Sequence, residues 1–240
     1  MTDVSVSVVA DAQTLARTVA EQLLGLLGSI QAEGRVPSIA LTGGTIAADI
    51  YRALARLDSS AVDWTQVDFW WGDERYVPAD SSDRNDREVE LDLLDVVGAD
   101  PSRVHAMPAA DEAHPDVASA AAAYELELRT HGGGQFDLVL LGLGPDGHVA
   151  SLFPGFPQLD AEAIAVPVTG SPKPPPERIT LTFAALNRTR EVWFVVAGED
   201  KAEAVARALA DHGSVHQTPA RGITAEHRTW WLDQPAASSL

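Results

Sequence analysis

The chain carries the stretch LVLLGLGPDGHVASLFPG at residues 138–155, and the first four residues of this stretch decide the fold. Residues 138–141 (LVLL) are apolar at each position, and so are residues 192–197 (VWFVVA). Strands that are apolar on both faces belong inside a parallel sheet whose faces are covered by helices. The two runs therefore predict an α/β protein with a parallel sheet at its centre.

Strand-like and helix-like segments alternate along the rest of the chain. Further segments have the apolar or alternating pattern of strands: residues 4–9, 38–41, 67–71 and 229–232. Others have apolar residues at helical spacing: residues 15–27, 46–57, 86–97, 118–128 and 201–210. We expect one doubly wound, Rossmann-like domain over residues 1–240, with a mostly parallel sheet and helices on both faces. Residues 235–240 are expected to be a loose tail.

The composition excludes several classes of protein. Of the 240 residues, 45% are hydrophobic and 22% are charged, as in globular proteins. The chain has no cysteine, which excludes disulfides and thiolate chemistry. No apolar run reaches the ~18 residues of a membrane span, and Met1-Thr2-Asp3 does not begin a basic-then-apolar signal pattern. These features favour a cytoplasmic protein that has no membrane partner.

The net charge of −18, from 35 acidic and 17 basic residues, argues against a nucleic-acid partner. An acidic surface also repels small anions. If the ligand is an anion, a local cluster of bases and backbone N–H groups must capture it. Only two of the bases are lysines, Lys173 and Lys201. Lys201 follows the apolar run 192–197 and Arg178 follows a proline-rich loop, which makes both candidates for the cluster; otherwise they are ordinary surface bases.

Loops at the carboxyl ends of parallel strands are where ligands bind in such sheets. The first, residues 42–45 (TGGT), joins a strand to a helix. Its glycines, Gly43 and Gly44, allow close approach of the backbone, and a helix N-terminus attracts phosphate. The alternative is a plain strand–helix turn with Thr45 as the N-cap.

Charged and titratable side chains occupy two further loops of this kind. Residues 72–78 form a loop that presents Asp73 and Arg75, either at a ligand or as a solvated, self-neutralising cluster. Residues 142–155 present Asp146 and His148. An imidazole can take and return a proton near neutral pH, and a neighbouring carboxylate can orient it. A merely structural histidine is the alternative.

Three other chemistries fit the sequence poorly. The formal G-x-G-x-x-G at 142–147 has Glu162 twenty residues after its first glycine, but Pro154 and Pro157 end any following helix within about two turns, too soon for a dinucleotide site. Asp146 and His148 could supply two metal ligands, but the other histidines are scattered, so we expect no metal. No G-x-S-x-G elbow is present, which leaves base-activated water as the simplest nucleophile of a hydrolase.

Five segments together resemble one family, the 6-phosphogluconolactonases, whose superfamily also contains glucosamine-6-phosphate deaminase and ribose-5-phosphate isomerase-like enzymes. The segments are LTGGT (41–45), WWGDERYVP (70–78), LGLGPDGHVASLFPG (141–155), PPERITLT (175–182) and GEDKA (198–202). The resemblance implies hydrolysis of 6-phospho-D-glucono-1,5-lactone to 6-phosphogluconate in the oxidative pentose phosphate pathway, without a cofactor. The substrate is a small phosphorylated molecule, and the chain is expected to be a monomer or a weak homo-oligomer.

The resemblance also implies roles for individual residues. His148 resembles the general base, Asp146 and Asp73 match acids that line the active site, and Arg75 matches an arginine near the substrate. The implied phosphate-binding set is Gly43, Gly44, Thr45, Arg178 and Lys201. The family commonly has S-G-G-S-T-P in its first loop. Here Ile46 replaces the threonine, which removes one hydroxyl contact but leaves the backbone N–H donors in place.

Two rival functions remain to be compared. Related deaminases resemble G-H-I-A-F-N-E-P after the histidine, where the glutamate assists ring opening, whereas residues 150–154 (ASLFP) contain no acid. Non-catalytic sugar-phosphate sensors carry a DNA-binding helix-turn-helix before the α/β domain, whereas this chain enters its first strand by Val4 and is strongly acidic. Both features favour the lactonase.

Overall fold

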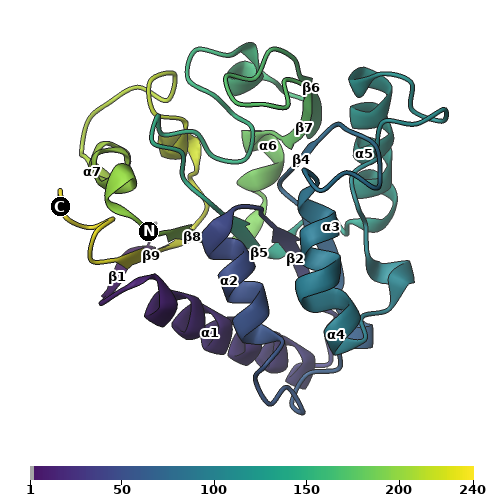
Figure 1. The fold of residues 1–240 in the computed structure, drawn as a ribbon, viewed down its shortest axis with the longest axis horizontal. Helices are drawn as coiled ribbons and strands as arrows, with labels where there is room; N and C mark the ends of the chain where they lie inside the picture. Colours follow the sequence, from purple (N-terminus) through teal and green to yellow (C-terminus); the bar gives the residue numbers. More distant parts are fainter. Residues whose placement is uncertain (1–2) are drawn as a thin grey trace.

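A six-stranded parallel sheet forms the centre of the protein, whose computed structural model describes residues 3–240 (Figure 1). The strand order is β1-β9-β8-β5-β2-β3, and all neighbours run parallel. The strands are β1 Asp3–Val9, β2 Ser38–Leu41, β3 Asp68–Trp71, β5 Phe136–Leu141, β8 Thr189–Val196 and β9 His227–Asp233. Strand β5 is buried at every position, as its apolar run predicts. The predicted α/β fold with a parallel sheet is confirmed.

Helices cover both faces of this sheet. They are α1 Ala12–Ala32, α2 Thr45–Leu54, α3 Asn85–Val89, α4 Asp95–Val97, α5 Val117–His131, α6 Phe183–Leu186 and α7 Ala202–Leu209. The chain steps toward β3 through α1 and α2 and steps back through α5 and α7 (Figure 1). Because such crossovers are right-handed, α1 and α2 lie on one face while α5 and α7 lie on the other. Within residues 3–240, no helix has the length and apolar character needed to cross a membrane.

A second, three-stranded antiparallel sheet lies beside the first and was not expected from the sequence. Its strands are β4 Asp73–Arg75, β7 Arg178–Leu181 and β6 Ala165–Val168, in the order β4-β7-β6. The sequence predicts a loop at 72–78, because a three-residue strand is too short to show a period. Gly72 joins the two sheets: its N–H donates to Leu41 O at 2.9 Å, and its carbonyl accepts from the N–H of Leu181 at 2.8 Å.

Two other segments differ from or refine the expectation. The last residues form turns rather than a loose tail: Ala236 is buried, and its N–H donates to the carboxylate of Asp233 at 2.8 Å. The carboxylate of Asp233, at the end of β9, therefore holds the last residues in place. Residues 142–156 form turns and an isolated bridge with no helix, so a dinucleotide site lacks even its first helical turn.

Candidate active site

A cavity of about 640 Å³ opens at the carboxyl edge of the central sheet. The loops that follow β2, β5 and β8 border it, together with β4. It is lined by most of the site residues that the sequence predicts: Gly43, Gly44, Thr45, Asp73, Arg75, His148, Arg178 and Lys201. Residues far apart in the sequence are thus brought to one crevice, at the place where parallel α/β sheets bind ligands.

The remaining predicted residue, Asp146, does not line the cavity itself but contacts His148, which does. The Nδ1 atom of His148 lies 2.6 Å from Oδ1 of Asp146. Burial raises the pKa of Asp146, but the hydrogen bond and the charge of His148 outweigh burial and lower the pKa to about 2. Because an ionised carboxylate only accepts hydrogen bonds, Nδ1 carries a proton, and whenever the ring is neutral Nε2 is the acceptor.

The backbone of the loop is shaped around this pair. An added Cβ on Gly144 would lie 2.0 Å from Nδ1 of His148 and 2.5 Å from Oδ1 of Asp146, so only glycine leaves room for both side chains. Ala150 has a φ of +48°, the one positive value at a non-glycine position within residues 3–240. Backbone strain of this kind is concentrated at functional sites, where the surrounding structure holds it in place.

Ser151 follows the strained residue and connects the loop to the small sheet. Its Oγ donates to Oδ2 of Asp73 at 2.6 Å, and its N–H donates to Oγ1 of Thr180 at 3.1 Å. Both Ser151 and Asp73 are buried. The sequence did not single out Ser151, because nothing in the pattern ASLFPG shows that the backbone turns its hydroxyl toward β4. The contact fixes one carboxylate oxygen of Asp73.

Basic side chains gather at another part of the wall. The Arg178 guanidinium is buried and donates to the carbonyls of Lys173 and Pro174 at 3.0 and 3.1 Å. Burial lowers the pKa of Arg178; the negative charge of Asp73 opposes this shift, and the positive charge of Arg75 adds to it. Burial likewise lowers the pKa of the Lys173 ammonium, with a further contribution from Lys201. Such mutual repulsion between cations indicates a place where an anion binds.

Lys173 and other residues of this wall were not predicted as site residues. The cavity also takes in Asn85, Lys173, Asp200 and Asp233. The scarcity of lysine was a usable signal for Lys173. The chain has two lysines, Lys173 and Lys201, and both line this cavity. Lys201 is held by Asp200, with Nζ 3.1 Å from Oδ2.

The TGGT loop differs in one detail from the expectation. Gly44, with a φ of +103°, is the N-cap of α2, and Thr45 is the first helical residue rather than the cap. Within the described part of the chain, no side chain caps the first turn of α2. Its free N–H groups and the helix dipole favour an anion at this end of the cavity.

Metal binding finds no support in the arrangement of side chains. In the part of the chain from Asp3 to Leu240, no group of three or more histidine, cysteine, aspartate or glutamate side chains is placed to hold an ion. The groups that the cavity offers are an imidazole, carboxylates, guanidinium and ammonium groups, and backbone N–H donors.

Known proteins resemble this chain along nearly its whole length. The sequence model described as "Glucosamine-6-phosphate isomerases/6-phosphogluconolactonase" matches residues 10–231. A 6-phosphogluconolactonase of Streptomyces coelicolor is 45% identical, covering 96% of this chain and 92% of its own. That of Mycobacterium leprae is 40% identical over 98% of both. The crystal structure of 6-phosphogluconolactonase from Thermotoga maritima has a TM-score of 0.85 at 28% identity, covering 97% of this chain and 100% of its own.

Proposed function

The chain belongs to the family of glucosamine-6-phosphate isomerases and 6-phosphogluconolactonases, and on that premise we propose how its cavity hydrolyses 6-phospho-D-glucono-1,5-lactone. It is a lactonase, a carboxylic ester hydrolase whose product is 6-phospho-D-gluconate. The observation that carries the mechanism is the His148–Asp146 pair at a cavity that also holds a free helix N-terminus and a group of bases.

His148 acts first as a general base. Nε2 of its neutral ring takes a proton from water while the water oxygen attacks the lactone carbonyl carbon. Asp146 holds the ring in this tautomer and stabilises the imidazolium that forms, since its low pKa keeps it ionised at neutral pH. The result is a tetrahedral intermediate with a negative oxygen.

The same imidazolium then acts as the acid. As the carbonyl re-forms, the bond between the carbonyl carbon and the ring oxygen breaks, and His148 returns its proton to that oxygen. One water is consumed, and the open-chain acid forms without a covalent enzyme intermediate. Arg75 or a loop N–H stabilises the oxyanion, and donors in comparable sites contribute about 3–4 kcal/mol. Asp73, fixed by Ser151, orients the sugar nearby.

Phosphate binding places the lactone over His148. The N-terminus of α2, Arg178 and Lys201 hold the phosphate, and Lys173 adds a further cation. Binding energy from this remote group positions the reacting carbonyl. We propose that the enzyme functions as a monomer or a weak homo-oligomer. We also propose that the enzyme acts in the cytoplasm, because charged sugar phosphates do not cross membranes unaided.

A coupled hydrolysis assay tests this function directly. It compares 6-phosphogluconolactone, unphosphorylated gluconolactone and glucosamine 6-phosphate, with correction for spontaneous lactone opening. We expect the wild-type chain to prefer the phosphorylated lactone and to leave glucosamine 6-phosphate unchanged, and His148→Ala to abolish turnover. Undiminished hydrolysis by His148→Ala would remove His148 from its role, and deamination of glucosamine 6-phosphate would favour the rival activity.

A further inference from the structure

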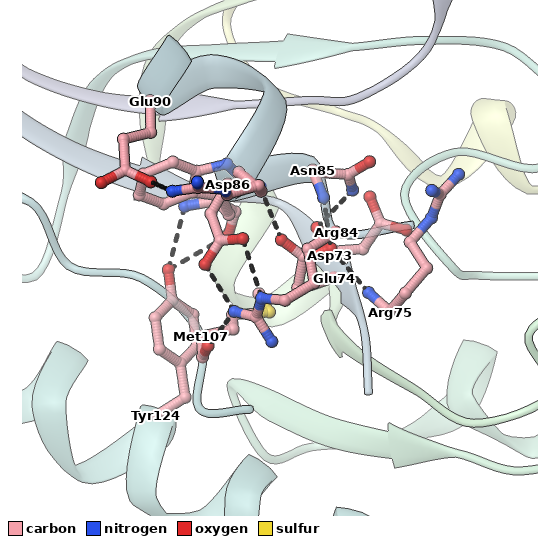
Figure 2. Close-up of polar contacts among 11 residues, drawn as sticks. Asp73, Glu74, Arg75, Arg84, Asn85, Asp86, Glu90, Met107 and Tyr124 are labelled. Carbon is pink, nitrogen blue, oxygen red and sulfur yellow. Dashed lines mark hydrogen bonds and ion pairs between the residues drawn. The ribbon is translucent and has the colours of Figure 1, made fainter. Parts of the chain in front are cut away.

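A fully buried carboxylate beside the cavity has no part in the mechanism above. Glu74 lies on β4 between Asp73 and Arg75, but unlike them it does not line the cavity, and its side chain lies against the start of α3 (Figure 2). Oε1 accepts from the N–H of Asn85 at 2.7 Å, and Oε2 accepts from the N–H of Asp86 at 2.8 Å. Glu74 therefore ties the strand that carries the active-site acid to the beginning of α3.

Two arginines hold the same junction. The buried Arg84 guanidinium donates to the carboxylate of Asp86, with Nε at 2.8 Å, and to Met107 O at 2.6 Å (Figure 2). From the cavity side, Nη1 of Arg75 donates to Asp83 O at 2.7 Å. The segment 83–86 is thus fixed at several points.

This framework holds the side chain of Asn85 at the cavity wall. Asn85 is buried against protein, and its Nδ2 donates to Asp73 O at 3.1 Å. Its Oδ1 packs onto the backbone of Gly43, where an added Cβ would lie only 1.9 Å away. The carboxamide therefore sits between the TGGT loop and β4, that is, between the proposed phosphate site and the active-site acid.

The chain offers an internal comparison, because Asn187 is its other asparagine. The carboxamide of Asn187 is used at both ends: Nδ2 donates to Gly222 O at 2.9 Å, and Oδ1 accepts from the N–H of Thr224 at 2.7 Å. Among the hydrogen bonds of residues 3–240, the side chain of Asn85 takes part in one, through Nδ2. Its acceptor capacity and second N–H remain for a ligand in the cavity.

We propose that Asn85 is a specificity-determining residue whose carboxamide hydrogen-bonds one hydroxyl of the sugar, and that Glu74 is the residue that positions it. The inference rests on the proposed lactonase function. A neutral group that both donates and accepts matches a hydroxyl, whereas the phosphate and the oxyanion are served by cations and N–H groups. Because the Asn85 carboxamide lies between the proposed phosphate site and Asp73, the hydroxyl is one of those carried by carbons 2 to 4 of the lactone.

The test compares Asn85→Ala with wild type on 6-phosphogluconolactone and on its 2-, 3- and 4-deoxy derivatives. We expect kcat/KM for the parent lactone to fall about tenfold, which corresponds to the loss of one hydrogen bond that discriminates substrates. One deoxy derivative should be hydrolysed equally well by both proteins, because it lacks the hydroxyl that Asn85 contacts. Equal losses on all four lactones, or no loss on any, would overturn the proposal.

Two further variants separate positioning from general damage to the fold. Asn187→Ala is the matched control: it should lower the melting temperature and leave the ratios of kcat/KM among the four lactones unchanged. Glu74→Gln should lower kcat/KM mainly on the lactones that retain the hydroxyl. If Glu74 acts through Asn85, the double variant loses no more kcat/KM than Asn85→Ala alone; an additive loss would refute the positioning role.

Failure of this inference is distinguishable from failure of the proposed function. Wild-type turnover of the parent lactone, and its loss in His148→Ala, test the function alone. A chain that passes both tests while Asn85→Ala shows no preference among the deoxy lactones refutes only the role of Asn85. A wild-type chain without lactonase activity would refute both.

Discussion

The His148 loop, residues 142–155, and the β4–α3 segment, residues 73–89, border the same cavity but hold their carboxylates in opposite ways. Asp146 of the loop keeps 36% of its side chain exposed and pairs with an imidazole, which lowers its pKa to about 2 despite partial burial. Glu74 of the segment is fully buried and bound by backbone N–H groups, and burial raises its pKa to about 7.

The two carboxylates therefore have different roles: Asp146 takes part in the proposed chemistry, and Glu74 holds the backbone in place. A carboxylate that must stay ionised beside a reacting histidine is left partly in water and next to a group that becomes cationic. A carboxylate that fixes the backbone can be buried completely, because N–H groups satisfy its oxygens. Adjacent residues of one motif also have different positions: Asp73 lines the cavity, whereas Glu74 is bound by backbone N–H groups behind it.

The largest expected effect is on turnover. Asp146→Asn removes the charge that favours the imidazolium of His148 and no longer selects the tautomer with a free Nε2. We expect kcat to fall about a thousandfold. Steady-state kinetics in the coupled assay measure the change. Asp160→Asn is the matched control, because Asp160 pairs with His216 at 3.2 Å on the surface. A kcat within threefold of wild type for Asp146→Asn would mean that the pair is structural.

The largest effect on stability should come from removing the buried carboxylate of Glu74. Glu74→Ala leaves the N–H groups of Arg75, Asn85 and Asp86 without their acceptor. We expect the free energy of unfolding to fall by about 3 kcal/mol, and the melting temperature by about 6–12 °C. Urea and thermal unfolding measure both. Glu90→Ala, which removes an exposed partner of Arg87, should change stability by less than about 0.5 kcal/mol. Equal effects of the two variants would contradict the structural role of Glu74.

Gly43→Ala tests the contact between the TGGT loop and the β4–α3 segment. The new Cβ would overlap Oδ1 of Asn85, so we expect a loss of about 1–3 kcal/mol in stability. Truncating the Asn85 side chain removes this overlap. The double variant with Gly43→Ala and Asn85→Ala should therefore be more stable than the sum of the two single effects predicts. Strictly additive losses in urea unfolding would show that the two residues do not meet.

The smallest effect is a dependence of stability on pH. The lowered pKa of Asp146 means that its ionised form stabilises the fold above its unfolded pKa of about 3.9, and that this contribution disappears as pH falls toward 2. With a third of the side chain in water, we expect about 1 kcal/mol. The stability difference between wild type and Asp146→Asn should therefore shrink between pH 4 and pH 2.

Glu74 provides the contrast for this pH experiment. Its pKa is raised, so its contribution is complete below its unfolded pKa of about 4.3 and is lost only as pH rises toward 7. The difference between wild type and Glu74→Gln should stay constant from pH 4 to pH 2. Unfolding curves in which both differences move together would contradict the opposite directions of the two shifts.

The sequence predicted the central sheet because period and composition are local properties. Buried parallel strands such as residues 138–141 are apolar on both faces, and the position of a ligand at their carboxyl ends follows from topology. The motif residues His148 and Arg178 could be placed on this basis, and both line the cavity.

The remaining features depend on pairs of residues that are far apart in the chain. Strands β4, β6 and β7 have three or four residues each and exist because they pair with one another. The contacts of Ser151 with Asp73 and of Asn85 with Gly43 are of the same kind. Lys173 lies in a proline-rich loop with no period, and only the scarcity of lysine in the chain distinguishes it. Single-sequence patterns contain no information about such pairing.

The central claim is that one crevice holds His148 for chemistry and a separate group of cations for the phosphate. Titration calorimetry of 6-phosphogluconate into His148→Ala and Lys201→Ala tests it most directly. We predict that His148→Ala binds the product within about threefold of wild type, whereas Lys201→Ala binds it at least about tenfold more weakly. Loss of binding in His148→Ala with full binding in Lys201→Ala would contradict the account.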